Sequence, residues 1–253
     1  MKKKITLLLT VIMMLTLVAC NNNEFKEKND FNKIDKSEIA TTDETEHIEP
    51  QEKLDHFFEG EKDMIEKTQM LIKKLNEYGY DTGSIKAILC CMYSQSKLLA
   101  TAAEGDYALQ EAHASMLDVK DTNRDSMFAA YDTYCEVFAT SDIYDGSMSY
   151  MYGDRVCCGI GLMQWTGKRA VSLIQFASDN NKCWYDYEIQ VAYLNEELER
   201  LYADDPDGLK KIKQMSFENA LNELIEKYTG GGENALQSAM NVEAKIDAIL
   251  KEN

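Results

Sequence analysis

The residues best suited to bind a ligand lie in one block of the chain, from Gly159 to Arg169. Its glycines, including Gly161, allow a backbone to approach a ligand closely. Trp165 offers a flat apolar face that suits a pyranose ring, and the Gln164 side chain offers both donors and acceptors. The same residues also fit a plainer interpretation, in which Trp165 is a core residue and the glycines make turns. The block is therefore a candidate sugar-binding site.

Carboxyl groups would give such a site hydrolytic chemistry, because cleavage of a glycosidic bond needs a proton donor. Asp142 and Asp145 lie near a turn-rich segment, where a carboxylate can face a cleft. Glu104 is a poor candidate, because it falls on the opposite side of the preceding helix if that helix continues so far. Two further acids are open candidates, Glu111 and Glu136. Each of these acids also fits a solvated surface position in a very acidic chain.

Other kinds of catalytic site are disfavoured. The chain has no Gly-x-Ser-x-Gly nucleophile motif and no Gly-x-x-x-x-Gly-Lys-Ser/Thr phosphate loop. Its three histidines are scattered, and no Cys-x-x-Cys pair accompanies them, so neither a metal site nor a cofactor is expected.

Helical spacing of apolar residues dominates the chain from Leu54 onward. The pattern predicts a first helix that contains Ile65 to Leu75 and ends near Tyr78, and a helix start soon after Gly167. It also predicts helices over about 85–99, 107–117, 126–138, 187–201 and 217–228, and a last helix through Ile249. In the helix over 85–99, Gln95 follows Met92 by three residues and Ile88 by seven, so it lies on the apolar face. A polar side chain on that face should point into the core or into a cleft.

The segment 141–165 has a different pattern. Asp145-Gly146, Gly153-Asp154 and two further glycines separate short runs with tyrosine and methionine. These are turn signals between short extended pieces. We therefore expect a mainly α protein of the α+β class, with a helical domain and a small β-hairpin region near 143–165.

The N-terminus has the features of an export signal. Three lysines precede an apolar run that is too short to span a membrane comfortably, and the run ends at Cys20. Leu17 to Cys20 resembles a bacterial lipoprotein box, which implies cleavage of residues 1–19 and lipidation of Cys20. Residues 20–52 are polar and acidic and are predicted to be a flexible tether. The expected location is the cell membrane, on its extracytoplasmic face, and the domain would comprise residues 53–253.

The charge and the cysteines limit the partners. The formal net charge is −17, and removal of residues 1–19 leaves 24 basic against 44 acidic residues, a net of −20. Such a surface repels nucleic acid and suits a basic protein partner. Six cysteines follow Cys20. Because thiols outside the membrane can oxidise, we expect one or two disulfides and some buried free thiols.

Three segments resemble the phage-tail type of lysozyme domain. Residues 159–169 are similar to its Gly-x-Gly-Leu-x-Gln-Trp-Thr-Gly-x-Arg segment, and 150–154 fit its short sheet. Residues 86–96 match its Ala-Gly-Ile-Leu-Gly-Asn-Met-x-Ala-Glu-Ser-Gly helix. The resemblance covers about residues 53–253 and implies a lysozyme-like fold and peptidoglycan as the partner. It also implies the following substrate-binding residues: Tyr152, Gly161, Gln164, Trp165 and Thr166.

The chain departs from this pattern at one position. The family's catalytic glutamate corresponds to Gln95, and a carboxamide has no proton to donate. General acid catalysis contributes a factor of about 10²–10⁴, so this change predicts a weakened or absent hydrolase that keeps its sugar groove. Two functions follow as hypotheses: a lysozyme-like glycoside hydrolase, or a non-catalytic glycan-binding or interaction protein at the cell wall.

Overall fold

The computed structural model describes residues 61–251. The predicted signal segment 1–19, the lipidation site Cys20 and the tether 20–52 lie outside the described residues. None of the helices in the described part of the chain is long and apolar enough to cross a membrane.

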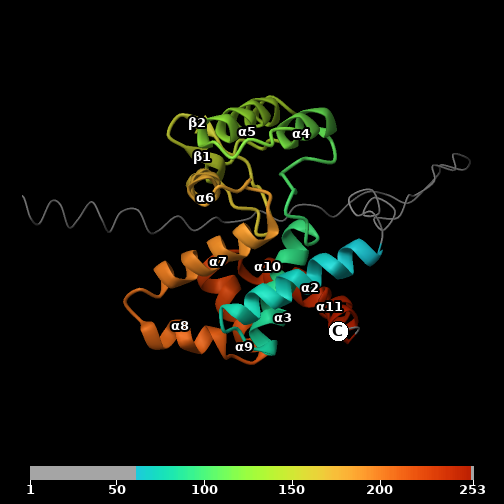
Figure 1. Ribbon diagram of the computed structural model, residues 1–253, viewed down its shortest axis with the longest axis vertical. Helices are drawn as coiled ribbons and strands as arrows, with labels where there is room; N and C mark the ends of the chain where they lie inside the picture. The colour runs from blue at the N-terminus through green and yellow to red at the C-terminus, as the bar shows by residue number, and fades with distance from the viewer. Residues whose placement is uncertain (1–60, 252–253) are drawn as a thin grey trace, which may run out of the picture. The chain divides into compact units, whose positions relative to one another are not determined.

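The domain is mainly helical, with one short hairpin, as the sequence predicts (Figure 1). The α-helices are α2 (Glu61–Glu77), α3 (Thr82–Ser96), α4 (Gln110–Leu117), α5 (Arg124–Ala139), α6 (Lys168–Asp179), α7 (Tyr187–Leu201), α8 (Pro206–Lys213), α9 (Phe217–Glu223), α10 (Gly232–Asn241) and α11 (Glu243–Lys251). The short elements are the 3-10 helix η1 (Met148–Tyr150), the strands β1 (Met151–Tyr152) and β2 (Arg155–Val156), and the π-helix η2 (Leu224–Thr229).

Helix α3 is the centre of the helical packing. Most of its residues are buried, and it packs against α9, α10 and α11. Its first turn is capped by the Asp81 carboxylate, which accepts a hydrogen bond from the Ser84 backbone N–H at 3.0 Å. Its last turn ends where Lys97 and Leu98 take positive φ angles of 57° and 65°.

This helix end corrects the predicted helix over 85–99. Left-handed backbone at two successive residues cannot continue a right-handed helix, so the chain turns away after Ser96. Leu99 and the residues up to Leu109 therefore form a loop before α4. The structure also differs at α8, which the sequence pattern did not predict, and at the last predicted helix, which is divided into α10 and α11.

The hairpin is the small antiparallel sheet that the turn signals predict. Met151 pairs with Val156 and Tyr152 pairs with Arg155, and Gly153 makes the turn at a φ of +64°. It lies beside α5 and α6, in the same part of the domain as α4 (Figure 1). Only four residues of the segment 141–165 are in strands, and loops and η1 make up the rest.

The six cysteines of the described region are free thiols, which corrects the expected disulfides. Five are buried and pack as small apolar residues in the core. Among them, the sulfurs of Cys135 and Cys158 lie 3.4 Å apart.

Candidate functional site

A cleft of about 300 Å³ brings residues from six parts of the chain together. Its walls come from the end of α3, the loop after it, η1, the loop before α6, the first turn of α6, and η2. The lining residues are Gln95, Glu104, Ser149, Tyr150, Met163, Gln164, Thr166, Arg169, Tyr228 and Thr229.

The backbone of Glu104 is fixed on both sides. Its N–H donates to the Gly159 carbonyl at 2.8 Å, and its own carbonyl accepts from the Tyr134 hydroxyl at 2.8 Å. The preceding residue, Ala103, forms an antiparallel bridge with Ile160. The loop after α3 is therefore joined to the loop before α6, and Glu104 sits at that junction.

The side chain of Glu104 lies over a glycine that leaves room for it. A Cβ atom on Gly159 would come within 3.1 Å of the Glu104 Oε2 and within 2.9 Å of the Gln164 Oε1. The carboxyl and the amide thus both lie close to the Cα of Gly159 at the cleft. Gly159 was expected to let a ligand approach the backbone. In the structure its missing Cβ instead makes room for the Glu104 and Gln164 side chains.

The pKa of the Glu104 carboxyl is raised above its ordinary value of 4.5. Burial is the main cause, because it disfavours the charged form, and the negative charges of Asp106 and Asp145 add to it. A hydrogen bond from Tyr150 opposes the shift. A half-buried carboxyl that holds its proton to higher pH has the property that a general acid needs.

Gln95 also lines the cleft, on the last turn of α3. Its side chain is exposed, unlike the buried Met92 and Ser96 beside it. The neighbouring Ser96 hydroxyl donates to the Leu162 carbonyl at 2.9 Å and so fixes α3 against the loop before α6.

Gln164 and Thr166 both line the cleft, and their role in binding a sugar stays a prediction. Gln164 has a positive φ of 48°, and its amide donates to the Gly161 carbonyl at 3.0 Å. The Thr166 hydroxyl donates to the Gln164 carbonyl at 2.8 Å. These bonds fix both residues of the loop before α6 in the wall of the cleft.

Trp165 requires a correction. Its side chain is fully buried, at 0% exposure, so it has no free face for a sugar ring. The indole Nε1 instead donates to the Glu197 carboxylate at 2.7 Å and lies 3.0 Å from the Tyr228 hydroxyl. The plainer interpretation of Trp165 as a core residue is correct, because its ring is enclosed while the neighbouring Gln164 and Thr166 are half-buried at the cleft.

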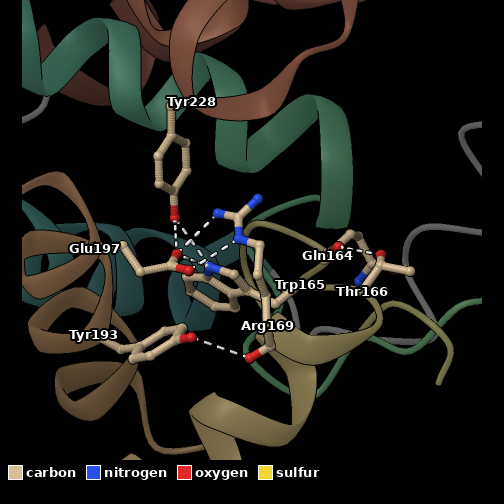
Figure 2. A network of polar contacts seen from close by, with 7 residues as sticks. All are labelled: Gln164, Trp165, Thr166, Arg169, Tyr193, Glu197 and Tyr228. Carbon is tan, nitrogen blue, oxygen red and sulfur yellow. Dashed lines mark hydrogen bonds and ion pairs between the residues drawn. The ribbon is translucent and has the colours of Figure 1, made fainter. Parts of the chain in front are cut away.

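The Trp165 indole belongs to a polar network that reaches the cleft (Figure 2). Arg169 donates to Glu197 through Nε at 2.9 Å and through Nη2 at 2.8 Å, and Tyr228 donates to the same carboxylate. The Arg169 guanidinium lies 4.5 Å from the centre of the Tyr228 ring. Burial alone would raise the pKa of Glu197, but the hydrogen bonds and charge of Arg169 hold it below its usual value.

The remaining predicted residues do not line the cleft. Gly161 has a φ of +76° and lies against the Gln190 amide, which holds the loop before α6 by a hydrogen bond to Leu162. Tyr152 is 43% exposed on β1 and lines a separate hollow beside Arg155. The other acids are exposed: Glu111, Glu136, Asp142 and Asp145. Of these, Asp145 acts on the site through its charge, because it raises the pKa of Glu104.

Sequence reasoning missed three groups of the site, Glu104, Arg169 and Tyr228. Glu104 was a poor candidate only because the helix was predicted to continue past Ser96, where α3 ends. Arg169 was visible as the end of the Gly159 to Arg169 block, but no role was assigned to it. Tyr228 was counted with the apolar stripe of the helix that ends near it, and it lies in the π-helix η2.

A mainly helical domain with one small hairpin and a cleft that holds a half-buried carboxyl is lysozyme-like. The model of the phage tail lysozyme family matches residues 66–248, which is most of the chain, so the protein belongs to that family. Neither a curated protein nor a solved structure matches the chain significantly.

Proposed function

We propose that this protein hydrolyses the glycan strands of peptidoglycan, with the Glu104 carboxyl as the proton donor in place of the family's glutamate. The observation that supports this is the raised pKa of Glu104 in the cleft that Gln95 also lines. Protonation of the glycosidic oxygen by this carboxyl would assist departure of the leaving sugar. Gln95 and Gln164 would hydrogen-bond the bound strand through their amides.

The test is the Glu104→Gln variant of the full-length chain. Release of reducing ends from purified peptidoglycan should fall by about 10²–10⁴-fold, because the amide cannot donate the proton. The matched control is Glu111→Gln, which removes the same charge at an exposed position of α4 and should keep full activity. Full activity in Glu104→Gln, with the protein folded, would reject Glu104 as the acid.

A second function, non-catalytic binding of glycan, is supported by the carboxamide at position 95. In that case the unaltered protein binds peptidoglycan without cleaving it. The Gln95→Glu variant distinguishes the two functions, because it restores the family's acid at the edge of the same cleft. Hydrolysis that appears only in Gln95→Glu would favour the binding protein, whereas hydrolysis that already depends on Glu104 would favour the enzyme.

We further propose that the protein is exported, cleaved before Cys20 and anchored by a lipid on that cysteine. The lysine-rich start, the apolar run and the Leu17 to Cys20 box support this. The mass of the mature protein should correspond to a chain that begins at a diacylated Cys20. In a Cys20→Ala variant the membrane fraction should retain no acylated product, and an unchanged lipid-bearing mass would reject the proposal.

A further inference from the structure

The cleft carries a fixed cation as well as an acid. The groups that shift the pKa of Glu104 are Tyr150, Asp106 and Asp145. Those that shift the pKa of Arg169 are Glu197, Tyr228 and Tyr193. Arg169 is paired with Glu197 through two hydrogen bonds, and no ion pair joins it to Glu104 among the described residues. Arg169 is therefore not the counter-ion of Glu104, and its presence in the lining has another cause.

Arg169 is held in place by Glu197 but has a hydrogen-bond donor left over within the described part of the chain. Nε and Nη2 both donate to Glu197, while Nη1 has no hydrogen-bond partner among the described residues. Figure 2 shows this terminal nitrogen directed away from the Glu197 carboxylate. The Arg169 side chain is 36% exposed and that of Glu197 is 13% exposed. The carboxylate thus anchors one edge of the guanidinium and leaves a donor edge accessible at the cleft.

The surrounding network makes this donor geometrically fixed. Trp165 and Tyr228 bond to Glu197, which prevents the carboxylate from rotating, and the Tyr228 ring supports the guanidinium from one side. A planar cation with a preorganised donor edge suits a carboxylate better than a neutral hydroxyl. The chain has a net charge of −17 and repels acidic ligands elsewhere, so a cation held at this cleft would favour an acidic ligand there over a neutral one.

We propose that Arg169 forms an anion subsite that binds a carboxylate of the glycan substrate, so that the cleft prefers acidic peptidoglycan strands to neutral glycan. This rests on the proposed function, since it assigns the substrate class of the same cleft. Peptidoglycan offers that carboxylate from two sources. Strands without peptides carry it on the lactyl ether of each muramic acid, and intact strands carry it on their peptide stems.

The experiment measures binding in the Glu104→Gln background, so that the strands are not consumed. Three probes are compared: strands with peptides, strands stripped of peptides, and neutral N-acetylglucosamine oligomers of the same length. Adding Arg169→Gln should weaken binding of at least one acidic probe by about tenfold or more, because a charge-assisted hydrogen bond is lost. Binding of the neutral oligomer should stay the same, and the acidic probe that responds identifies the source of the carboxylate.

Removal of Arg169 also leaves the partly buried Glu197 without its cation, so a second variant separates binding from folding. Arg169→Gln with Glu197→Gln removes both charges and should fold while keeping the selective loss for acidic strands. Arg155→Gln is the charge control, because Arg155 is exposed and pairs with Asp132 away from the cleft. Equal weakening for acidic and neutral probes, or no weakening at all, would overturn the subsite.

This outcome is independent of the proposed chemistry. If Glu104→Gln leaves hydrolysis intact, the proposed acid fails while the selectivity of binding can still hold. If Glu104→Gln abolishes hydrolysis but Arg169→Gln changes the binding of acidic and neutral probes equally, the anion subsite is rejected and the proposed hydrolase activity stands.

Discussion

The carboxyl of Glu104 is surrounded by groups that change its proton affinity in opposite directions. Burial and the charge of Asp145 raise its pKa, and the hydrogen bond from Tyr150 lowers it. A general acid acts while it is protonated, so activity should be lost as pH rises through the pKa of the folded protein. The basic limb of the pH–rate profile should therefore lie above the ordinary glutamate value of 4.5.

Two substitutions should move this limb in opposite directions. Tyr150→Phe removes a bond that favours the carboxylate, so the pKa of Glu104 rises and the limb shifts to higher pH. Asp145→Asn removes a repelling charge, so the pKa falls and the limb shifts to lower pH. Profiles of kcat/KM against pH for the two variants test this. A shift of both limbs in one direction would show that Glu104 does not control the reaction.

At the scale of elements, the loop before α6 decides the shape of the cleft. It is held by the buried Gln190 amide, which accepts from the Leu162 N–H at 2.7 Å and donates to the Ala100 and Trp184 carbonyls. It is also tied to α3 by Ser96 and to the loop after α3 by the bridge at Ile160. These bonds place Glu104 and Gln164 side by side although neither is in a regular element.

Gly161→Ala tests this control by the loop. A Cβ would meet the Gln190 Oε1 at 2.7 Å, and the φ of +76° disfavours any side chain. The left-handed conformation alone costs about 1–2 kcal/mol, and displacement of the Gln190 amide adds to it. Thermal unfolding should show a larger loss for Gly161→Ala than for Gly153→Ala, which has a φ of +64° and nothing within 4 Å of the added atom. Equal losses would mean that Gln190 does not anchor the loop.

At the scale of the whole molecule, the excess of acidic residues is the dominant electrostatic feature. With 44 acidic and 27 basic residues, the surface charges repel one another in the folded state. Added salt screens this repulsion because the Debye length shortens to about 8–10 Å.

The melting temperature should therefore rise with salt. We expect a gain of about 1 kcal/mol in the free energy of unfolding between low and physiological ionic strength, which corresponds to about 2–4 °C in Tm for a domain of this size. Scanning calorimetry at neutral pH in increasing NaCl measures it. A Tm that falls with salt would indicate that attractive ion pairs, such as Lys86 with Glu243 and Asp247, outweigh the repulsion.

The sequence by itself determined most of the helical segments, though not α8, and where the hairpin lies, because apolar periodicity and turn residues act over a few neighbours. It also located Gln95 and the Gln164 to Thr166 loop, since local motifs carry both. The identity of the acid depended on the tertiary structure. Lys97 and Leu98 end α3 in left-handed conformations, and the chain then pairs Ala103 with Ile160.

The same reason explains the reversal of roles between Trp165 and Arg169. Both stand in one motif, and their types alone favour the indole as the sugar contact. Only the contacts of Trp165 with Glu197 of α7 and Tyr228 of η2 show that the indole is enclosed, while the guanidinium of Arg169 lines the cleft. A motif specifies residue types along the chain, whereas exposure depends on which distant elements cover each side chain, and that is decided by packing of the whole domain.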